Sequence, residues 1–532
     1  MKRITKMPFK VVVCDHIHGD GLSILQNDKQ IDFVNASDED KTKLLDIIAD
    51  ADIAITRSST DIDEKFIKAG KNLKAVVRAG VGVDNVDIEG CSKVGIIVMN
   101  VPTANTIAAV ELTMTHLLSC ARSFPYAHNH LKQQRVWRRQ DWYGVELKDK
   151  KIGVIGFGNI GSRVGVRAKA FEMDVVTYDP YIDPKKATDL GVRYTTDFDE
   201  ILQCDFITIH TPKTHETIDM ITKDEIAKMK EGVVLINCAR GGLYNEKDLF
   251  EALKSKRVKF AGIDVFDKEP ALDHPLLDLD NVTVTPHLGA NTLESQRRIG
   301  IEAAQQAIEA AKGISYPNAM NLPIKENEIS EIGKKYLDLV QKISFFAAQA
   351  TKSSIKKIEV SVDGEIERYI DSLTTFSVVG ALKESLGDKI NYVNAEHVAK
   401  DRGIEVVKKR YERSSGYLNM VRVDLTAGSS VFSICGTVFD ENKLRIIGIN
   451  EYDLDIEPKG RMILLKNDDT PGVIGDVGKI LAKHSINIAD FRLGRSEKQA
   501  LAVIVVDEKI DKNIIQELKE LQATIEVTTV VI

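Results

Sequence analysis

The sequence predicts an α/β protein with two doubly wound parallel-sheet domains, followed by two smaller α+β units. Three observations support this prediction. Short apolar runs alternate with amphipathic stretches through the first half of the chain. A long helical stretch divides these runs into two series. The segment from Met462 to Ile532 then shows a different order of strands and helices.

The first series of apolar runs has the lengths and β-branched residues of strands. Helical stretches such as Ser37–Ile48 lie between them, and this alternation indicates βαβ units in a parallel sheet. The expected strands include Lys10–Cys14, Ile53–Thr56, Ala75–Arg78 and Ile96–Met99.

The second series is apolar almost throughout, as expected for strands covered on both faces. Its expected strands are Ile152–Gly156, Asp174–Tyr178, Phe206–His210, Val233–Asn237, Phe260–Asp264 and Val282–Thr285. The helix Asn105–Cys120 would lead into this domain, and the helix Thr292–Ala311 would return to the first one. The simplest organisation therefore inserts a domain at 103–293 into a domain made of 1–102 and 294–325.

The rest of the chain divides into 326–455 and 456–532. The former has a helix with an apolar stripe before strands rich in Val and Ile, and no cluster of chemically functional residues. The latter reads β-α-β-β-α-β, which is the ferredoxin-like order. Its elements are expected at Met462–Lys466, Gly475–His484, Ile486–Arg492, Ala500–Val506, Asn513–Leu521 and Thr524–Ile532.

Composition excludes several classes of function. The net charge of −7 argues against a protein that binds nucleic acid. No apolar stretch approaches the roughly 18 residues that span a bilayer, so we expect no membrane segment and a cytoplasmic protein. The 6 cysteines show no metal-ligand or disulfide spacing, so we expect reduced thiols and no bound metal.

A glycine motif, Gly156-Phe-Gly158-Asn-Ile-Gly161, leaves one expected strand and enters the helix Ser162–Phe171. The first glycine would make the tight turn, the second would let the backbone approach a pyrophosphate, and the third would let helix and strand pack closely. The helix N-terminus would offer free N–H groups to the phosphates. The motif in this context predicts a Rossmann-like dinucleotide site.

The acid at the end of the next strand selects the dinucleotide. Asp179 stands 18 residues after Gly161, the distance at which an acid binds the ribose 2′-hydroxyl. Its charge would repel a 2′-phosphate, so NAD is expected rather than NADP.

Three further strand ends carry an arginine, a glutamate and a histidine: Arg240, Glu269 and His287. Ligands of open parallel sheets bind outside the carboxyl ends of strands, so these side chains should meet. Oxidation of a hydroxy acid needs a cation for the carboxylate, a base with a pKa near 7 and a carboxylate beside that base. Singly, each could be a turn or packing residue. Together, after a dinucleotide motif, they predict a dehydrogenase.

These motifs, Gly-Phe-Gly-Asn-Ile-Gly, Asn-Cys-Ala-Arg-Gly-Gly, Asp-Val-Phe-x-x-Glu-Pro and Thr-Pro-His-x-Gly-Ala, resemble the D-2-hydroxyacid dehydrogenase family over about residues 8–320. The resemblance implies that His287 is the general acid/base, Glu269 its partner and Arg240 the carboxylate anchor. It implies NAD contacts from Gly156, Gly158, Asn159, Ile160, Gly161, Asp179, Thr211, Cys238, Asp264, His287, Gly289 and Ala290.

Within that family, the chain is similar to the members that oxidise 3-phosphoglycerate. The Gly80-Val81-Gly82 turn resembles their carboxylate-binding loop, although Val81 stands where some members have Thr. Segment 56–59 resembles their phosphate-side loop, and segment 136–139 resembles one that reaches a neighbouring subunit. The implied substrate residues are Arg57, Ser58, Gly80, Val81, Gly82, Asn105, and Arg138 or Arg139.

The tail resembles an ACT domain, and residues 326–455 resemble the intervening domain of the long form of such enzymes. An ACT domain implies an amino-acid effector, here L-serine, with Asn467, Asp469 and Asn487 at the matching positions. The pairing of such domains and the reaching arginines imply a homo-oligomer, a closed dimer or tetramer.

The function expected from these observations is NAD-dependent oxidation of 3-phospho-D-glycerate to 3-phosphohydroxypyruvate, the first step of L-serine biosynthesis. One alternative is a hydroxypyruvate or glyoxylate reductase, which Arg57 and the tail disfavour. A second is a non-catalytic sensor of NAD and an amino acid, which the intact Arg240, Glu269 and His287 set disfavours.

Overall fold

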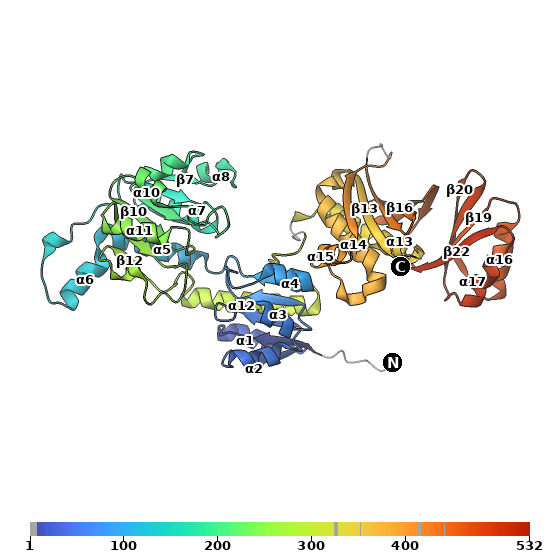
Figure 1. Cartoon of the computed structure of the whole chain (residues 1–532), viewed down its shortest axis with the longest axis horizontal. Coiled ribbons are helices and arrows are strands. Elements are labelled where there is room, and N and C mark those ends of the chain that lie inside the picture. The colour runs from blue at the N-terminus through green and yellow to red at the C-terminus, as the bar shows by residue number, and fades with distance from the viewer. Residues whose placement is uncertain (1–7, 324–327, 352, 412–415, 441) are drawn as a thin grey trace.

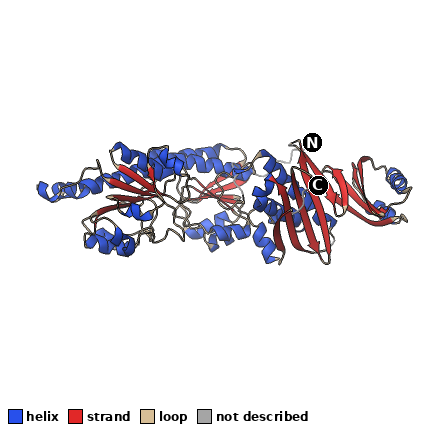
Figure 2. Ribbon diagram, turned by 90° about the horizontal axis from the view of Figure 1, so that it is seen from above, coloured by secondary structure: helices blue, strands red, loops and turns tan. Residues whose placement is uncertain are grey.

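The computed structural model describes residues 8–323, 328–351, 353–411, 416–440 and 442–532. These residues form four sheets, each with its own helices, arranged along an elongated molecule (Figures 1 and 2). The predicted α/β fold class with two doubly wound domains is confirmed, and the two α+β units follow in the predicted order.

The first sheet has the order β2-β1-β3-β4-β5, with every pair parallel. This is the flavodoxin-like order. Helices α1 and α12 cover one face, and α2, α3 and α4 cover the other. The elements are β1 (Phe9–Val13), α1 (Gly19–Asn27), β2 (Ile31–Asn35), α2 (Lys41–Ile48), β3 (Ile53–Thr56), α3 (Glu64–Ala69), β4 (Ala75–Arg78), α4 (Ile88–Val94), β5 (Ile97–Asn100) and α12 (Leu293–Lys312).

The second sheet has the order β12-β11-β10-β9-β6-β7-β8 and is also parallel. Its order reverses beside β6, as in Rossmann folds. The strands are β6 (Lys151–Ile155), β7 (Asp174–Tyr178), β8 (Arg193–Tyr194), β9 (Phe206–Ile209), β10 (Val233–Asn237), β11 (Val258–Ile263) and β12 (Val282–Val284). The helices are α7 (Asn159–Ala170), α8 (Pro184–Thr188), α9 (Phe198–Leu202), α10 (Lys223–Lys228), α11 (Glu246–Lys254) and η2 (Pro275–Asp278).

Two long helices join these sheet domains, as the sequence predicts. Helix α5 (Thr106–Arg122) leads into the second domain and α12 returns from it. Between α5 and β6, α6 (Phe124–Lys132) and η1 (Arg139–Asp141) form an arm that projects from the second domain at the far left of Figure 1.

Hydrophobic periodicity gives only an approximate start for a helix, and a capping side chain determines the actual first residue. We expected the helix before β3 to begin at Ser37, but α2 begins at Lys41. The carboxylate of Asp40 accepts hydrogen bonds from the amides of Thr42 and Lys43 at 2.9 and 3.0 Å. An N-terminal cap of this kind fixes the first turn of the helix.

The third unit is a mixed sheet with the order β14-β13-β15-β16-β17-β18, backed by two long helices, α13 and α14. Its elements are α13 (Glu331–Ala350), β13 (Ile355–Gly364), η4 (Glu365–Tyr369), α14 (Ile370–Leu386), η5 (Gly387–Lys389), α15 (Ala395–Asp401), β14 (Glu405–Arg410), β15 (Asn419–Ala427), β16 (Ser430–Phe439), β17 (Lys443–Ile449) and β18 (Tyr452–Ile456).

The fourth unit has the antiparallel order β20-β21-β19-β22, which confirms the ferredoxin-like prediction. Its elements are β19 (Arg461–Asp468), α16 (Val473–Lys483), β20 (Ile488–Ser496), β21 (Gln499–Val506), α17 (Lys512–Lys519) and β22 (Thr524–Val531). Helices α16 and α17 cover one face of the sheet. From the other face, Met462, Leu464 and Val503 pack into the core of the third unit. One hydrophobic core therefore spans both C-terminal units.

The predicted domain boundaries stay predictions. The boundary between 325 and 326 lies outside the described residues, and the one between 455 and 456 falls at the end of β18. Within the described ranges, no helix has the length and apolar character needed to cross a membrane.

Candidate active site

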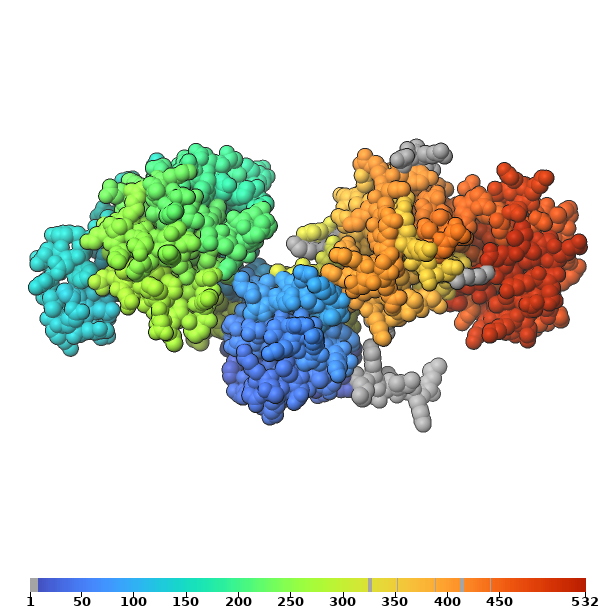
Figure 3. Space-filling model, in the orientation of Figure 1, coloured from blue at the N-terminus to red at the C-terminus, as the bar shows by residue number. Residues whose placement is uncertain are grey.

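A cavity of about 330 Å³ lies where the two sheet domains meet, shown green and blue in Figure 3. It is lined by the Gly82 turn after β4, the start of α5, the loops after β9 and β10, and the turn after β12. Ten of the predicted site residues line it: Val81, Gly82, Asn105, Ile160, Thr211, Cys238, Arg240, His287, Gly289 and Ala290.

The glycine turn has the three properties that a dinucleotide site requires. Gly156 has φ +83°, and a Cβ there would lie 2.8 Å from the carbonyl oxygen of His210. A Cβ on Gly161 would lie 2.0 Å from the Gly156 carbonyl oxygen, so only glycine allows this packing. A Cβ on Gly158 would meet nothing within 4 Å. The second glycine therefore faces open space, where a pyrophosphate would lie.

The start of α7 is suited to an anion. Gly158 precedes Asn159, the first helical residue, and no side chain caps the free N–H groups there. Asp179 directly follows β7 and accepts the Phe157 amide at 2.8 Å, which fixes the glycine turn against the acid. The buried hydroxyl of Thr211 has no hydrogen-bond partner among the described residues. Open backbone donors, an acid and an unpartnered hydroxyl fit NAD.

His287 and Glu269 form a hydrogen-bonded pair beside this groove. The imidazole Nδ1 donates to Oε2 of Glu269 at 2.8 Å, and Oε1 of that carboxylate accepts the Phe266 amide at 3.0 Å. The hydrogen bond that His287 donates to Glu269 raises the pKa of His287 above its ordinary value. Burial alone would raise the pKa of Glu269, but the bonds from His287 and Phe266 lower it. At neutral pH the carboxylate is ionised and orients the imidazole.

The turn that presents His287 is fixed from below by Asp264. His287 has φ +52°, which is uncommon outside glycine. Its amide donates to the Asp264 carbonyl at 2.9 Å, and the Asp264 carboxylate accepts the amides of Leu288 and Gly289 at 2.7 and 2.9 Å. Asp264 is fully buried, so it anchors this turn from beneath the cavity.

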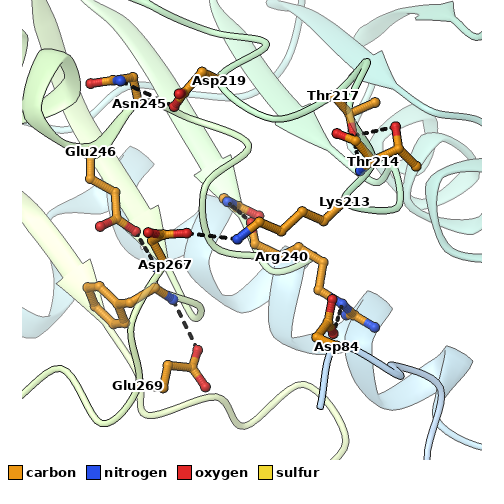
Figure 4. A network of polar contacts seen from close by, with 12 residues as sticks. Asp84, Lys213, Thr214, Thr217, Asp219, Arg240, Asn245, Glu246, Asp267 and Glu269 are labelled. Carbon is orange, nitrogen blue, oxygen red and sulfur yellow. Dashed lines mark hydrogen bonds and ion pairs between the residues drawn. The ribbon is translucent and has the colours of Figure 1, made fainter. Parts of the chain in front are cut away.

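Arg240 reaches from the end of β10 across the boundary between the two domains. Its Nε donates to Asp84 of the first domain at 3.1 Å (Figure 4). The neighbouring loops are held by a second set of contacts, because Lys213 donates to Asp267 at 2.7 Å and Glu246 accepts the Asp267 amide at 2.7 Å. The loop that carries Glu269 is thereby tied to the loops after β9 and β10.

Arg78, at the end of β4, is a candidate site residue that the sequence analysis missed. Its Nε is buried and has no partner within the described part of the chain, as is also true of Arg57. Burial and the positive charges of Arg57 and Arg240 lower the pKa of Arg78 to about 10. Three guanidinium groups in one neighbourhood form a receptor for a doubly charged anion. A glycine two positions on, Gly80, was the available signal: a Cβ there would lie 1.9 Å from the Arg78 guanidinium.

Some predicted residues do not line this cavity. Arg57 donates to the His16 carbonyl at 3.0 Å, its amide bonds to Asp15, and Ser58 is exposed. Arg138 and Arg139 lie on the arm, and the approach of Arg138 to Asp141 at 4.0 Å is within that segment. Whether they complete the site of another subunit stays a prediction.

A second cavity, of about 450 Å³, lies in the fourth unit at the start of α16. Asn467 and Asp469 line it, together with the Pro471–Ile474 turn and Arg495, whose Nε lies 3.4 Å from Asp469. Asn487 does not line it, because its side chain donates to Asp507 at 2.6 Å. One chain therefore brings together two of the three predicted effector residues.

Comparison with known families matches three parts of the chain. Residues 114–289 match the D-isomer specific 2-hydroxyacid dehydrogenase, NAD binding domain. Residues 333–450 match the D-3-phosphoglycerate dehydrogenase intervening domain, and residues 461–523 match the ACT domain.

Relatives and solved structures agree with these matches. A D-3-phosphoglycerate dehydrogenase of Bacillus subtilis is 38% identical over 515 residues, covering 96% of this chain and 97% of the relative. One of Methanocaldococcus jannaschii is 37% identical over 517 residues, covering 96% and 98%. A D-lactate dehydrogenase structure from Aquifex aeolicus, complexed with NAD and lactic acid, has a TM-score of 0.51 at 27% identity and covers 57% of this chain and 96% of that one.

An NAD-dependent formate dehydrogenase structure from Staphylococcus aureus, in complex with NAD, has a TM-score of 0.53 at 28% identity, covering 59% of this chain and 99% of that one. Both structures match the two sheet domains in extent, while the full-length relatives also cover the C-terminal units. By its glycine turn, its paired His287 and Glu269, and its identity along nearly the whole length of these relatives, the chain belongs to the D-3-phosphoglycerate dehydrogenase family.

Proposed function

We propose that the chain oxidises 3-phospho-D-glycerate to 3-phosphohydroxypyruvate with NAD, the first step of L-serine biosynthesis. The observation that carries the proposal is that His287, hydrogen-bonded to Glu269, lines one cavity with Arg240, whose positive charge also acts on the partly buried guanidinium of Arg78. A base, a carboxylate anchor and a receptor for a phosphate are the groups that this reaction needs.

His287 is the proposed general acid/base. Its Nδ1 is bound to Glu269, which leaves Nε2 to accept the proton of the C2 hydroxyl. Glu269 then stabilises the imidazolium that forms. NAD, when bound along the Gly158–Gly161 turn, supplies the acceptor for the C2 hydride. Arg240 holds the substrate carboxylate and polarises the forming carbonyl.

The amides of Val81 and Gly82, which line the cavity, assist Arg240 at the carboxylate, because backbone N–H groups in a glycine-rich turn form an anion nest. Arg57 and Arg78 receive the phosphate at the other end of the substrate. Their unpartnered Nε atoms support this role. Asn105 lines the same cavity, and its buried Oδ1 is without a partner in the described residues, which suits a substrate hydroxyl donor.

The reductase alternative shares the base and the carboxylate anchor but requires no phosphate receptor. Burial and the neighbouring charges of Arg57 and Arg240 disfavour the charged form of Arg78 more than Asp15 and Asp84 favour it, and a phosphate dianion would offset that cost. A non-catalytic sensor would require neither the hydrogen bond between Glu269 and His287 nor the phosphate receptor. Both features favour the dehydrogenase.

Two finer parts of the proposal concern assembly and regulation. The chain acts as a homo-oligomer, in which Arg138 or Arg139 of one subunit completes the phosphate site of another. L-Serine binds the ACT unit with its ammonium on Asp469 and its carboxylate on the free amides at the start of α16, where no side chain caps the helix. Asn487 would then contribute from a paired subunit.

The test is NADH absorbance with purified protein, NAD and 3-phosphoglycerate, with and without millimolar L-serine. D-glycerate and D-lactate serve as controls. Rapid NADH formation with phosphoglycerate alone supports the dehydrogenase, and its reduction by serine supports the effector. Turnover that favours the unphosphorylated acids would contradict the substrate, and no turnover with any acid would contradict the enzyme.

A further inference from the structure

Beneath the active site, His116 of α5 makes a set of contacts that the proposed reaction does not yet use. Its imidazole is 3% exposed and faces β12 rather than the cavity. Nδ1 lies 2.8 Å from the Thr283 hydroxyl and Nε2 lies 2.9 Å from the Thr285 hydroxyl. The ring fits because the facing residue of β11 is Gly262: a Cβ there would lie 2.7 Å from the His116 Cβ.

The second of these contacts leads to the turn that carries the catalytic base. The Thr285 hydroxyl lies 2.6 Å from Oδ1 of Asp264. That carboxylate accepts the amides of Leu288 and Gly289, and the Asp264 carbonyl accepts the amide of His287. Asp264 therefore accepts the amides of His287, Leu288 and Gly289, and Thr285 joins it to His116.

The direction of each hydrogen bond in this chain follows from the number of protons. Thr285 has one hydroxyl proton and must give it to Asp264, because an ionised carboxylate only accepts. The Thr285 oxygen therefore accepts from Nε2–H of His116. A neutral imidazole has one N–H, so Nδ1 is bare and accepts the proton of Thr283.

His116 can hold this arrangement only while uncharged, and its surroundings keep it so. Burial lowers the pKa of His116 to about 4, and no charged side chain contacts the ring among the described residues. Cys120, one turn further along α5, approaches Thr283 with its sulfur 3.5 Å from the hydroxyl oxygen. The bonds thus run one way, from Thr283 through His116 and Thr285 to Asp264, and hydrogen bonds aligned in this way strengthen one another.

We propose that His116 is a positioning residue for the reaction: its neutral ring, held between Thr283 and Thr285, orients the Asp264 carboxylate and, through it, the turn that presents His287. The inference deepens the proposed function and rests on it for its kinetic test. Because α5 also joins the two sheet domains and begins at Asn105 in the cavity, His116 couples this connecting helix to the catalytic turn.

The test compares His116→Phe, which removes both ring nitrogens, with His116→Gln, whose amide keeps a donor toward Thr285. Tyr244→Phe is the control, since it deletes another buried hydrogen bond of the same domain, from the Tyr244 hydroxyl to the Ile236 carbonyl at 3.1 Å. We expect His116→Phe to lower kcat roughly 10-fold with KM within about twofold, His116→Gln to recover to within about threefold, and Tyr244→Phe to match the unmodified enzyme.

A second readout does not depend on the substrate. NMR titration of 13C-labelled histidine follows the imidazole of His287, which faces the charges of Glu269, Asp264 and Arg240. In His116→Phe a displaced Asp264 carboxylate raises the His287 pKa less, so the midpoint moves to lower pH. If the unmodified protein fails to oxidise phosphoglycerate, the proposed function fails, and this titration still decides the role of His116.

The outcomes are separable. A kcat for His116→Phe within twofold of the unmodified enzyme, an equal loss in His116→Gln, or an unchanged His287 midpoint would overturn the inference. Should His116→Phe not fold, Thr285→Val and Thr285→Ser replace that pair. The hydroxyl-free variant should lose activity, and the serine variant should retain it. Equal activity of these two variants would also overturn it.

Discussion

The Nδ1 atom of His287 lies 2.8 Å from Oε2 of Glu269, and the other oxygen of that carboxylate accepts the Phe266 amide at 3.0 Å. One oxygen of the Glu269 carboxylate is therefore held by a backbone amide, which leaves the other oxygen oriented toward the imidazole. This arrangement sets one tautomer of His287, in which Nδ1 carries the proton toward Glu269 and Nε2 is the acceptor, and it raises the pKa of the imidazole.

The pH dependence of oxidation should report this pair. His287 must be neutral to accept a proton, and Glu269 raises its pKa, so kcat/KM should fall as pH drops through that raised value. Glu269→Gln removes the charge, so the acid limb should move to lower pH while the plateau falls by roughly 10-fold or more. Initial rates across pH measure both effects. An acid limb that stays in place would contradict the assignment of Glu269.

Removing the imidazole of His287 should lower the rate of oxidation without weakening the binding of NAD. We expect His287→Ala to bind NAD with nearly the affinity of the unmodified protein, because the glycine turn and Asp179 are untouched. Turnover should fall at least ~100-fold, the usual contribution of a general base. NAD titration and steady-state kinetics give the two numbers. Near-normal turnover would refute this role of His287.

If Arg57 and Arg78 bind the phosphate, their removal should change the preference of the enzyme for phosphorylated over unphosphorylated substrates. Arg57→Ala and Arg78→Ala each remove a charge-assisted contact, so KM for 3-phosphoglycerate should rise roughly 10- to 100-fold, as expected for ~1.5–3 kcal/mol. Slow oxidation of D-glycerate, which has no phosphate, should change little. If both substrates suffer equally, these arginines do not bind the phosphate.

The glycine turn offers a matched pair of substitutions. A Cβ on Gly161 would lie 2.0 Å from the Gly156 carbonyl, so Gly161→Ala should lower both the melting temperature and the affinity for NAD. Gly158 faces open space in the free protein, so Gly158→Ala should weaken NAD binding without lowering the melting temperature. Calorimetry and NAD titration distinguish the two. Normal NAD affinity in Gly158→Ala would place the pyrophosphate elsewhere.

The sequence was sufficient to predict the fold class, and ten of the residues that it predicted for the site line one cavity. Apolar strands covered on both faces and a motif such as Gly156–Gly161 depend on local spacing, which a sequence records directly. The start of a helix differed from the predicted start where a capping side chain determines it, as Asp40 does for α2.

The sequence did not reveal residues whose contacts are made with parts of the chain that are distant in sequence. Arg78 belongs to no recognisable motif, and its guanidinium has room beside Gly80 only because that residue has no Cβ. His116 lies within an apolar helix, and its contacts come from β12, which is distant in the chain. The shared core of the two C-terminal units likewise depends on which face of the ACT sheet is left uncovered by α16 and α17.

The most direct test of the account is the ratio of kcat/KM for 3-phospho-D-glycerate to that for D-glycerate, measured as NADH formation with NAD in excess. We predict a ratio of at least ~100, since the phosphate contacts proposed for Arg57 and Arg78 are open only to the phosphorylated acid. We also predict that Arg78→Ala brings that ratio down by reducing the phosphoglycerate value alone. A ratio near one in the unmodified enzyme would contradict the proposed substrate.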